Sequence, residues 1–158
     1  MSDVLGTVKE LITAKGTKFY LSATTPSISG TEETDLAAFD ALNWTEVGMI
    51  ESIGEFGPEG NIGTFTPLGT GVACKFRGTT DNGEVQLSIA KTTTDTGLTE
   101  LISAQKSDDP LAYKIELSDG TAYTFNGLCR SCRVNVGSGD DAVKITATIA
   151  ITGTITEA

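Results

Sequence analysis

The chain has 158 residues, the length of a single domain, and it can enclose a sizeable hydrophobic core. Its formal net charge of −10 argues against generic binding to nucleic acids or anionic membranes, because such binding needs clustered lysine and arginine residues. No apolar run approaches the roughly 20 residues of a membrane-spanning helix, and residues 1–4 lack the basic stretch before an apolar core that marks a secretory signal. The acidic balance fits an ordinary solvated surface, or a surface that lies near DNA without adhering to it.

The chain begins with a leader over residues 1–16. Its apolar residues have the spacing of one face of a short helix, and they are Val4, Leu5, Val8, Leu11 and Ile12. Small residues nearby weaken that interpretation. Two alternatives therefore stay open, namely a frayed terminus and an arm that becomes ordered only on a partner.

Residues 18–23 alternate between polar and apolar side chains, which predicts a first strand. Residues 24–43 are polar and predict a loop with one brief helical turn. The apolar residues of that turn are Leu36, Phe39 and Leu42. Residues 44–52 predict another strand, whose alternation is broken. The break indicates a bulge, or a strand that is buried on both faces, with a neighbouring subunit covering one of them.

Residues 54–71 contain six glycines and two prolines, which predicts a long flexible loop. The same stretch carries large apolar side chains, namely Phe56, Ile62, Phe65 and Leu68. Long loops in small domains are uncommon and are usually functional, and apolar side chains on them need a surface to pack against. The segment is therefore either an Ω-loop packed on its own core or a loop that becomes ordered against another subunit.

Two strands of alternating polarity surround Asp81-Asn82-Gly83 in residues 72–89, and they predict an antiparallel hairpin. The period then becomes helical. Leu98, Leu101 and Ile102 share one stripe and predict a helix over about residues 95–106, with Asp95 or Thr96 as its N-cap.

Strand patterns return at residues 111–117 and 121–125, on either side of a tight Asp119-Gly120 turn. Residues 128–136 and 143–152 predict a further hairpin, whose last strand has one apolar and one threonine-rich face. The chain is therefore expected to be mainly β, an antiparallel β-sandwich or barrel-like fold with one short flanking helix.

Cys129-x-x-Cys132 has the spacing of a metal or redox motif. In a regular strand, however, residues three apart point to opposite faces. A structural zinc site needs four ligands, and the chain offers no histidine and only Cys74 as a further thiol. We therefore expect packed or idle thiols and no metal site.

Catalytic patterns are equally scarce. The chain has no histidine for acid–base chemistry, no nucleophile beside a plausible base, no phosphate-binding loop and no calcium loop. We expect neither enzymatic activity nor a cofactor.

The order of these parts resembles a known family. The motifs that carry the resemblance are Leu42-Asn43-Trp44-Thr45-Glu46-Val47, the long loop, the strand Gly83–Ala90, the helix start Asp95–Leu101, Tyr113–Leu117 with Asp119-Gly120-Thr121, Phe125-x-Gly127, and Ile151-Thr152-Gly153. Together they resemble the tail tube (major tail) proteins of long-tailed, lambda-like bacteriophages. The resemblance covers roughly residues 17–153 and rests on diffuse motifs.

The resemblance implies one tail tube domain, with an N-terminal segment at residues 1–16 that reaches other subunits, a β-sandwich core at 17–153 and a tail at 154–158. In the family, six copies form a ring, and rings stack into a hollow tube in the phage tail of the virion, after synthesis in the host cytoplasm. The implied partners are other copies of the chain, the tape measure protein, the tail terminator and tail tip or baseplate proteins. Double-stranded DNA passes through the lumen without specific binding, and no membrane is involved.

By position, the resemblance assigns contacts between subunits and rings to residues 1–16, the long loop and the C-terminus. The apolar candidates for these contacts are Val4, Leu5, Val8, Leu11, Phe56, Ile62, Phe65 and Leu68. Candidates for the lumen face are Glu46, Glu84, Gln86, Lys114 and Glu116. The strand cations are expected to pair with acidic groups of neighbouring copies, and they are Lys75, Arg77, Arg130 and Arg133.

Two other classes stay open. One is the related effector-conducting tube of contractile injection or secretion machines, which shares the fold. The other is an exported β-sandwich for adhesion or carbohydrate binding. That class predicts a secretory signal and an exposed aromatic platform, whereas the only tryptophan, Trp44, lies in a strand that we expect to be buried.

Overall fold

The computed structural model of the protein describes residues 11–22 and 32–157. Its elements in chain order are β1 (Lys18–Ser22), α1 (Glu32–Asp40), β2 (Thr45–Val47), β3 (Ile50–Ile53), β4 (Glu59–Phe65), β5 (Cys74–Asp81), β6 (Glu84–Ala90), α2 (Thr96–Gln105), β7 (Leu111–Glu116), β8 (Ala122–Asn135) and β9 (Lys144–Glu157).

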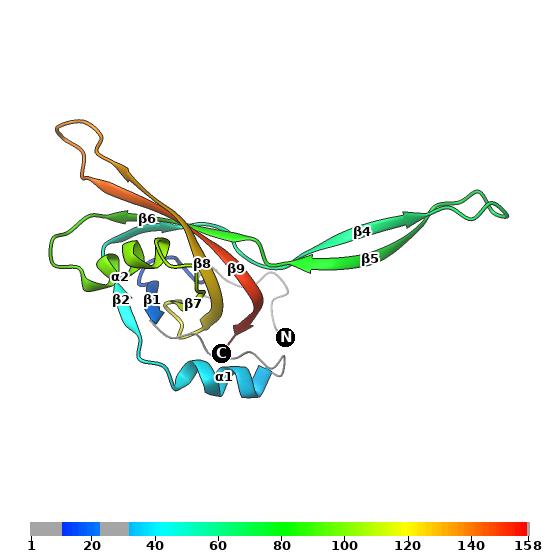
Figure 1. The fold of residues 1–158 in the computed structure, drawn as a ribbon, viewed down its shortest axis with the longest axis horizontal. Coiled ribbons are helices and arrows are strands. Elements are labelled where there is room, and N and C mark those ends of the chain that lie inside the picture. The colour runs from blue at the N-terminus through cyan, green and yellow to red at the C-terminus, as the bar shows by residue number, and fades with distance from the viewer. Residues whose placement is uncertain (1–10, 23–31, 158) are drawn as a thin grey trace, which may run out of the picture.

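The strands form two antiparallel sheets (Figure 1). The large sheet has seven strands in the order β2-β1-β7-β8-β9-β6-β3, and the small sheet is the β4–β5 hairpin. Although β2 and β3 follow each other in the chain, they form opposite edges of the large sheet. Only Gly48 and Met49 separate them, so the sheet must curl until its edges come near each other, without a ladder between them. The predicted mainly antiparallel β fold with one short helix beside it is confirmed, while the sheet is curled but not closed and no second layer makes a sandwich of the described residues.

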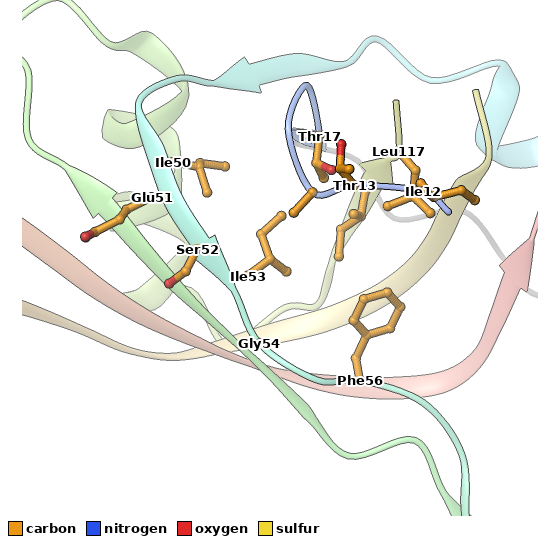
Figure 2. A pocket seen from close by; sticks show the side chains of 12 residues that line it. Ile12, Thr13, Thr17, Ile50, Glu51, Ser52, Ile53, Gly54, Phe56 and Leu117 are labelled. Atoms are coloured by element: carbon orange, nitrogen blue, oxygen red, sulfur yellow. The ribbon is translucent and has the colours of Figure 1, made fainter. Parts of the chain in front are cut away.

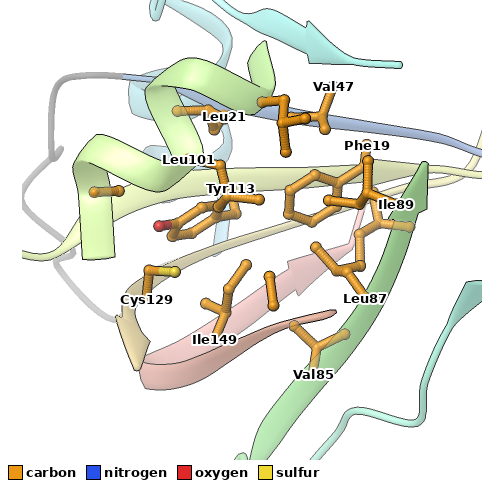
Figure 3. Close-up of a cluster of buried hydrophobic side chains, with 14 of the residues drawn as sticks. Phe19, Leu21, Val47, Val85, Leu87, Ile89, Leu101, Tyr113, Cys129 and Ile149 are labelled. Atoms are coloured by element: carbon orange, nitrogen blue, oxygen red, sulfur yellow. The ribbon is translucent and has the colours of Figure 1, made fainter. Parts of the chain in front are cut away.

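The inner face of the curled sheet holds the hydrophobic core (Figure 3). Near its centre, the Tyr113 ring lies between the rings of Phe19 and Phe125, with centroid distances of 5.8 and 5.9 Å. The strands alternate as predicted, since Val85 of β6 is buried and Glu84 is exposed. Each large side chain buried here contributes about 1.5–3 kcal/mol of hydrophobic free energy.

The predicted helix is confirmed as α2, which adds Leu98, Leu101 and Ala104 to the core. The Asp95 carboxylate is the N-cap. Its Oδ1 accepts a hydrogen bond from the Leu98 N–H at 3.2 Å, and its Oδ2 accepts one from the Gly48 N–H at 3.1 Å. One side chain therefore caps the helix and holds the link between β2 and β3.

The single strand predicted over residues 44–52 is wrong, because two strands share that segment. At the link, Met49 adopts a left-handed conformation with φ of 56°, which costs a non-glycine residue about 1 kcal/mol or more. Its carbonyl oxygen accepts a hydrogen bond from the Ala90 N–H at 2.9 Å. The broken alternation is thus the point where the chain leaves one sheet edge for the other.

The hairpin predicted over residues 72–89 is also wrong. β5 pairs with β4, whereas β6 pairs with β3 and β9. Asp81-Asn82-Gly83 is therefore the passage from the small sheet to the large one, and Gly83 has the expected positive φ, 76°. The long loop predicted over 54–71 is a strand, β4, in its middle part.

Residues 32–40 form a full helix, α1, where the sequence predicted one turn in a polar loop. Phe39 is buried outside the main core cluster, and its carbonyl oxygen accepts a hydrogen bond from the Trp44 Nε1–H at 3.2 Å. The helix was missed because its nine residues carry only a weak apolar stripe. Residues 23–31 of the predicted loop lie outside the described residues.

The two remaining hairpins, β7–β8 and β8–β9, are confirmed, although the strands predicted separately at residues 121–125 and 128–136 are one strand, β8. β9 extends to Glu157, five residues beyond the predicted end at 152. The ladder between β8 and β9 shifts register between Cys129 and Ser131. This bulge overturns the expectation that Cys129 and Cys132 point to opposite faces, since their Sγ atoms are 3.5 Å apart.

Gly97 is a close-packing point between α2 and β2. A Cβ there would overlap the carbonyl oxygen of Glu46 and the backbone of Val47. We expect Gly97→Ala to lower the free energy of unfolding by about 1–3 kcal/mol, because the backbone of β2 would have to shift to make room for the new methyl group. This cost should exceed the gain from the better helix propensity of alanine. Urea denaturation followed by circular dichroism measures this. Gly139→Ala, where a Cβ meets nothing within 4 Å, is the control. Equal stability of the two variants would contradict the packing argument.

Candidate functional site

Exposed surfaces are the most distinctive features of the described part of the chain. Among residues 11–22 and 32–157, no three histidine, cysteine, aspartate or glutamate residues gather as a metal site would require. No helix in these ranges is long and apolar enough to cross a membrane. The features that stand out are a projecting hairpin and two polar areas on the outer face of the large sheet.

The β4–β5 hairpin, which we call the arm, reaches away from the rest of the molecule (Figure 1). Every residue of β5 is exposed, and five of the seven residues of β4 are exposed. The side chains of β5 do alternate between two faces, as the sequence predicted. Both faces belong to a ribbon in solvent, however, so neither of them is buried. The arm is held by its own ladder and by its connections at Pro58 and Asn82.

The two faces of the arm differ in chemistry. Residues that lie directly opposite in an antiparallel ladder share a face. Phe76 lies opposite Gly63, and Phe65 opposite Cys74, so one face is apolar. A Cβ at Gly63 would overlap the Phe76 ring, so this glycine lets the ring lie flat across the ribbon. Arg77 and Lys75 lie on the other face together with Ile62, which is opposite Arg77, so that face combines two cations with one apolar side chain although the chain carries a net charge of −10.

Most apolar contact candidates within the described residues are exposed. The exposed fractions are 69% for Leu11, 62% for Ile62, 63% for Phe65 and 103% for Leu68. Phe76 and Val72, at 57% and 65%, belong to the same exposed set, although sequence reasoning placed them in a half-buried strand. Val4, Leu5 and Val8 lie outside the described residues.

Phe56 differs from the other loop candidates. Its ring packs edge-on against Tyr123, with a centroid distance of 5.5 Å, and lies 6.2 Å from the Phe125 ring. It also lines a groove of about 350 Å³ between β3 and residues 12–17 (Figure 2). The Ω-loop interpretation, packing on its own core, therefore describes Phe56, whereas the residues from 59 onward leave the core.

The lumen candidates divide into two groups. Glu46, Lys114 and Glu116 belong to β2 and β7, which flank β1. Tyr20 of β1 lies opposite both Glu46 and Lys114, so these side chains form one row on the outer face. The Lys114 ammonium lies 5.0 Å from the Tyr20 ring centroid and 5.5 Å from that of Trp44, which is half-buried. Burial and, after it, the Glu116 carboxylate raise the pKa of Tyr20.

Glu84 and Gln86 belong to the second group, on β6 near the other edge of the sheet. Glu84 Oε1 pairs with Arg130 Nη1 at 2.9 Å, and Glu51 Oε2 pairs with Lys144 Nζ at 2.8 Å. The hydrogen bond from Lys144 holds the pKa of Glu51 below its usual value. Arg130 therefore has an acidic partner within its own chain, contrary to the expectation that it serves a neighbouring copy.

This second area is a polar stripe over β8, β9, β6 and β3. Threonines and serines of these strands lie between the ion pairs, as the register of Gln86 with Thr148 and of Thr148 with Ser131 shows. Its paired charges are exposed or, for Lys144, half-buried, so each pair contributes little to stability in water. Arg133, which is exposed and lies opposite Thr146 on the same face, adds a cation outside these two ion pairs, so the stripe is a hydrated surface of mixed charge.

No family model matches the sequence, and no curated protein matches it. Solved structures match the fold closely. A chain of the sheath/tube terminator of the extracellular contractile injection system PVC, in the extended state, has a TM-score of 0.67 at 10% identity, covering 96% of this chain and 99% of that one. The tube-terminating cap of the anti-feeding prophage has 0.63 at 16% identity, covering 100% of both chains. The SPP1 tail tube has 0.58 at 12% identity, covering 93% of this chain and 78% of that one. The chain has a tail-tube-like fold.

Sequence reasoning missed the arm because its usual signal for a strand is an apolar face that is buried. In residues 59–81 that signal is replaced by glycine, threonine and scattered large apolar residues on a ribbon exposed on both faces. A usable signal was present in the register itself. Gly63 lies directly opposite Phe76, and Gly60 lies where the Arg77 side chain crosses the ribbon, so small residues stand where large side chains pass.

The arm is expected to be dispensable for folding of the core. Glu59 lies opposite Asp81, so residues 58–80 can be replaced by a short Gly-Ser linker that keeps Phe56 and β6 in place. We expect the free energy of unfolding to change by no more than about 1 kcal/mol, because the arm contributes no side chain to the main core. Thermal and urea unfolding measure this, with linker insertion at Gly139 as the control. Loss of cooperative unfolding in the armless variant alone would contradict an independent arm.

Proposed function

We propose that the chain is a structural tube subunit, of which six copies form a ring and rings stack into a hollow tube. The arm is the observation that carries this proposal. A ribbon that exposes Phe65, Leu68 and Phe76 has no folding purpose in an isolated copy, and large exposed apolar groups mark interaction sites. The tail-tube-like fold supplies the class of assembly.

The proposed partner of the arm is another copy of the chain. Its apolar face would lose water against a neighbour, and its Lys75 and Arg77 face would meet the acidic surface of a body whose net charge is strongly negative. Leu11 and the preceding residues are proposed as a second contact between copies. The strand edges at β2 and β3 offer further backbone pairing, which would remove exposed edges from the assembly.

We propose the polar stripe, with Glu84 and Gln86, as the lumen surface. Within the described residues, α2 packs on the inner face of β8 with its side chains in the core, and α1 packs near the end of β9, so the outer face of the stripe carries no helix of this part of the chain. Two ion pairs and many hydroxyl groups surround Arg133, and this single extra cation is too little positive charge to hold phosphates firmly, so double-stranded DNA would slide past without binding. Glu46, Lys114 and Glu116 would then lie away from the lumen, with Lys114 committed to its aromatic neighbours.

In the first form of the proposal, the tube belongs to a phage tail of the lambda-like kind, in the virion. Its partners would be the tape measure, terminator and tail tip or baseplate proteins, and it would conduct genomic DNA. The tube of a contractile injection machine is the second candidate. The similarity to chains of PVC and of the anti-feeding prophage favours this alternative. Both candidates are non-enzymatic tubes, and they differ in whether a sheath surrounds the tube.

Assembly of purified protein tests the proposal. At high concentration, with a tail initiation complex added if needed, we expect negative-stain electron microscopy to show hollow tubes of stacked rings. Phe65→Ser with Leu68→Ser should abolish tubes and leave a folded subunit, because both side chains are exposed and absent from the core.

Thr64→Ser on the same strand is the matched control and should assemble normally. A lone subunit that never assembles, even with an initiation complex, would argue against the tube. Tubes formed equally well by the Phe65/Leu68 double variant would argue against the arm as the connector.

A further inference from the structure

The thiols of Cys129 and Cys132 form a pair that a regular strand would not produce. Cys129 lies opposite Ile149, and Ser131 lies opposite Thr148, so Arg130 is the extra residue of a bulge in β8. The extra residue reverses the alternation once, so both cysteine side chains come to one side of the strand. Their Sγ atoms are 3.5 Å apart.

The pair lies where β8 meets α2. Cys129 is 7% exposed and belongs to the core, while Cys132 is half-buried and packs against that core. The Cys132 Sγ lies 3.9 Å from the carbonyl oxygen of Leu101 in α2. Cys132 is therefore the more exposed residue of the pair, and Cys129 is the more deeply buried one.

The surroundings make the two sulfurs unequal. The contact between the two thiols lowers the pKa of Cys132, while the same contact and burial raise the pKa of Cys129. The buried Tyr113 hydroxyl has no hydrogen-bond partner among the described residues, and both thiols raise the pKa of that phenol further. Figure 3 shows Tyr113 and Cys129 at the same end of the core. The thiol of the more exposed residue is thus also the better nucleophile.

We propose that Cys129 and Cys132 are a thiol–disulfide exchange site that closes to an intrachain disulfide with a low-molecular-weight disulfide such as oxidised glutathione. The Cys132 thiolate attacks one sulfur of the reagent, and a mixed disulfide forms as one glutathione thiolate leaves. Cys129 then loses its proton to solvent and attacks the Cys132 sulfur, and the second glutathione thiolate leaves. The protein loses two electrons and two protons, and the reagent gains the electrons.

The geometry requires only a local movement. The sulfurs must approach from 3.5 Å to a bond length of about 2.05 Å, which side-chain rotation and slight tightening of the bulge can provide. Reduced thiols are the expected state in a cytoplasm, and the disulfide the expected state outside a cell. The pair is present in each single copy, so this inference is independent of the proposed tube.

Intact-mass spectrometry after treatment with oxidised glutathione tests the site. The protein used is the full chain with Cys74→Ser, because Cys74 is exposed on the arm and would form its own adducts. We expect the mass to fall by that of two hydrogen atoms with no glutathione retained, and peptide mapping to place the bond between residues 129 and 132. Dithiothreitol should restore the original mass. A chain that stays reduced, or that ends as a stable glutathione adduct, would overturn the proposal.

Two further variants in the Cys74→Ser background separate the roles of the sulfurs. Cys129→Ser should stop at one retained glutathione on Cys132, because nothing displaces it. Cys132→Ser should react with oxidised glutathione at least tenfold more slowly, because the remaining thiol, that of Cys129, is buried. Equal adduct formation in both variants would contradict the assignment of Cys132 as the attacking sulfur. The parent result does not depend on these variants, and circular dichroism checks that they fold.

Discussion

The architecture depends on the two-residue link between opposite edges of one sheet. Gly48 and Met49 can span only about 10 Å even when extended, yet β2 and β3 border a sheet of seven strands. The sheet can satisfy both conditions only by curling, and curling creates the enclosed face that the aromatic core fills. Asp95 fixes this geometry, because one carboxylate binds the link and the first turn of α2. Met49 accepts a strained backbone conformation at the same place.

A curled sheet that encloses its own core leaves the arm without an internal role. The core takes its side chains from the large sheet and α2, with Phe56 as the last loop residue that joins it. Beyond that point, large apolar groups extend into solvent on a ribbon two strands wide. The same chain therefore contains a self-sufficient body and a segment whose burial requires another molecule, which is the property expected of a subunit that assembles.

Sequence patterns were reliable where one face of an element meets the core. The alternation in β6, β7 and β9 and the stripe and N-cap of α2 all follow from that condition. The arm has no buried face, so its alternation was assigned to a hairpin with the wrong partner. The β2–β3 link and the bulge at Arg130 were missed for another reason. Single residues out of register are set by long-range pairing with β6 and β9, which local periodicity does not contain. The sequence identified two residues of the polar stripe, Glu84 and Gln86. It did not separate them from Glu46 and Lys114, because that separation depends on the order of the strands in the sheet.

The most direct measurement is a cryo-electron microscopy reconstruction of the assembled protein at a resolution that shows side chains. The account predicts rings of six copies in which each arm crosses onto a neighbouring copy and buries Phe65 and Phe76, with the polar stripe facing the lumen. Arms that extend freely into solvent within an ordered tube would contradict the central claim that the exposed ribbon is the connector between subunits.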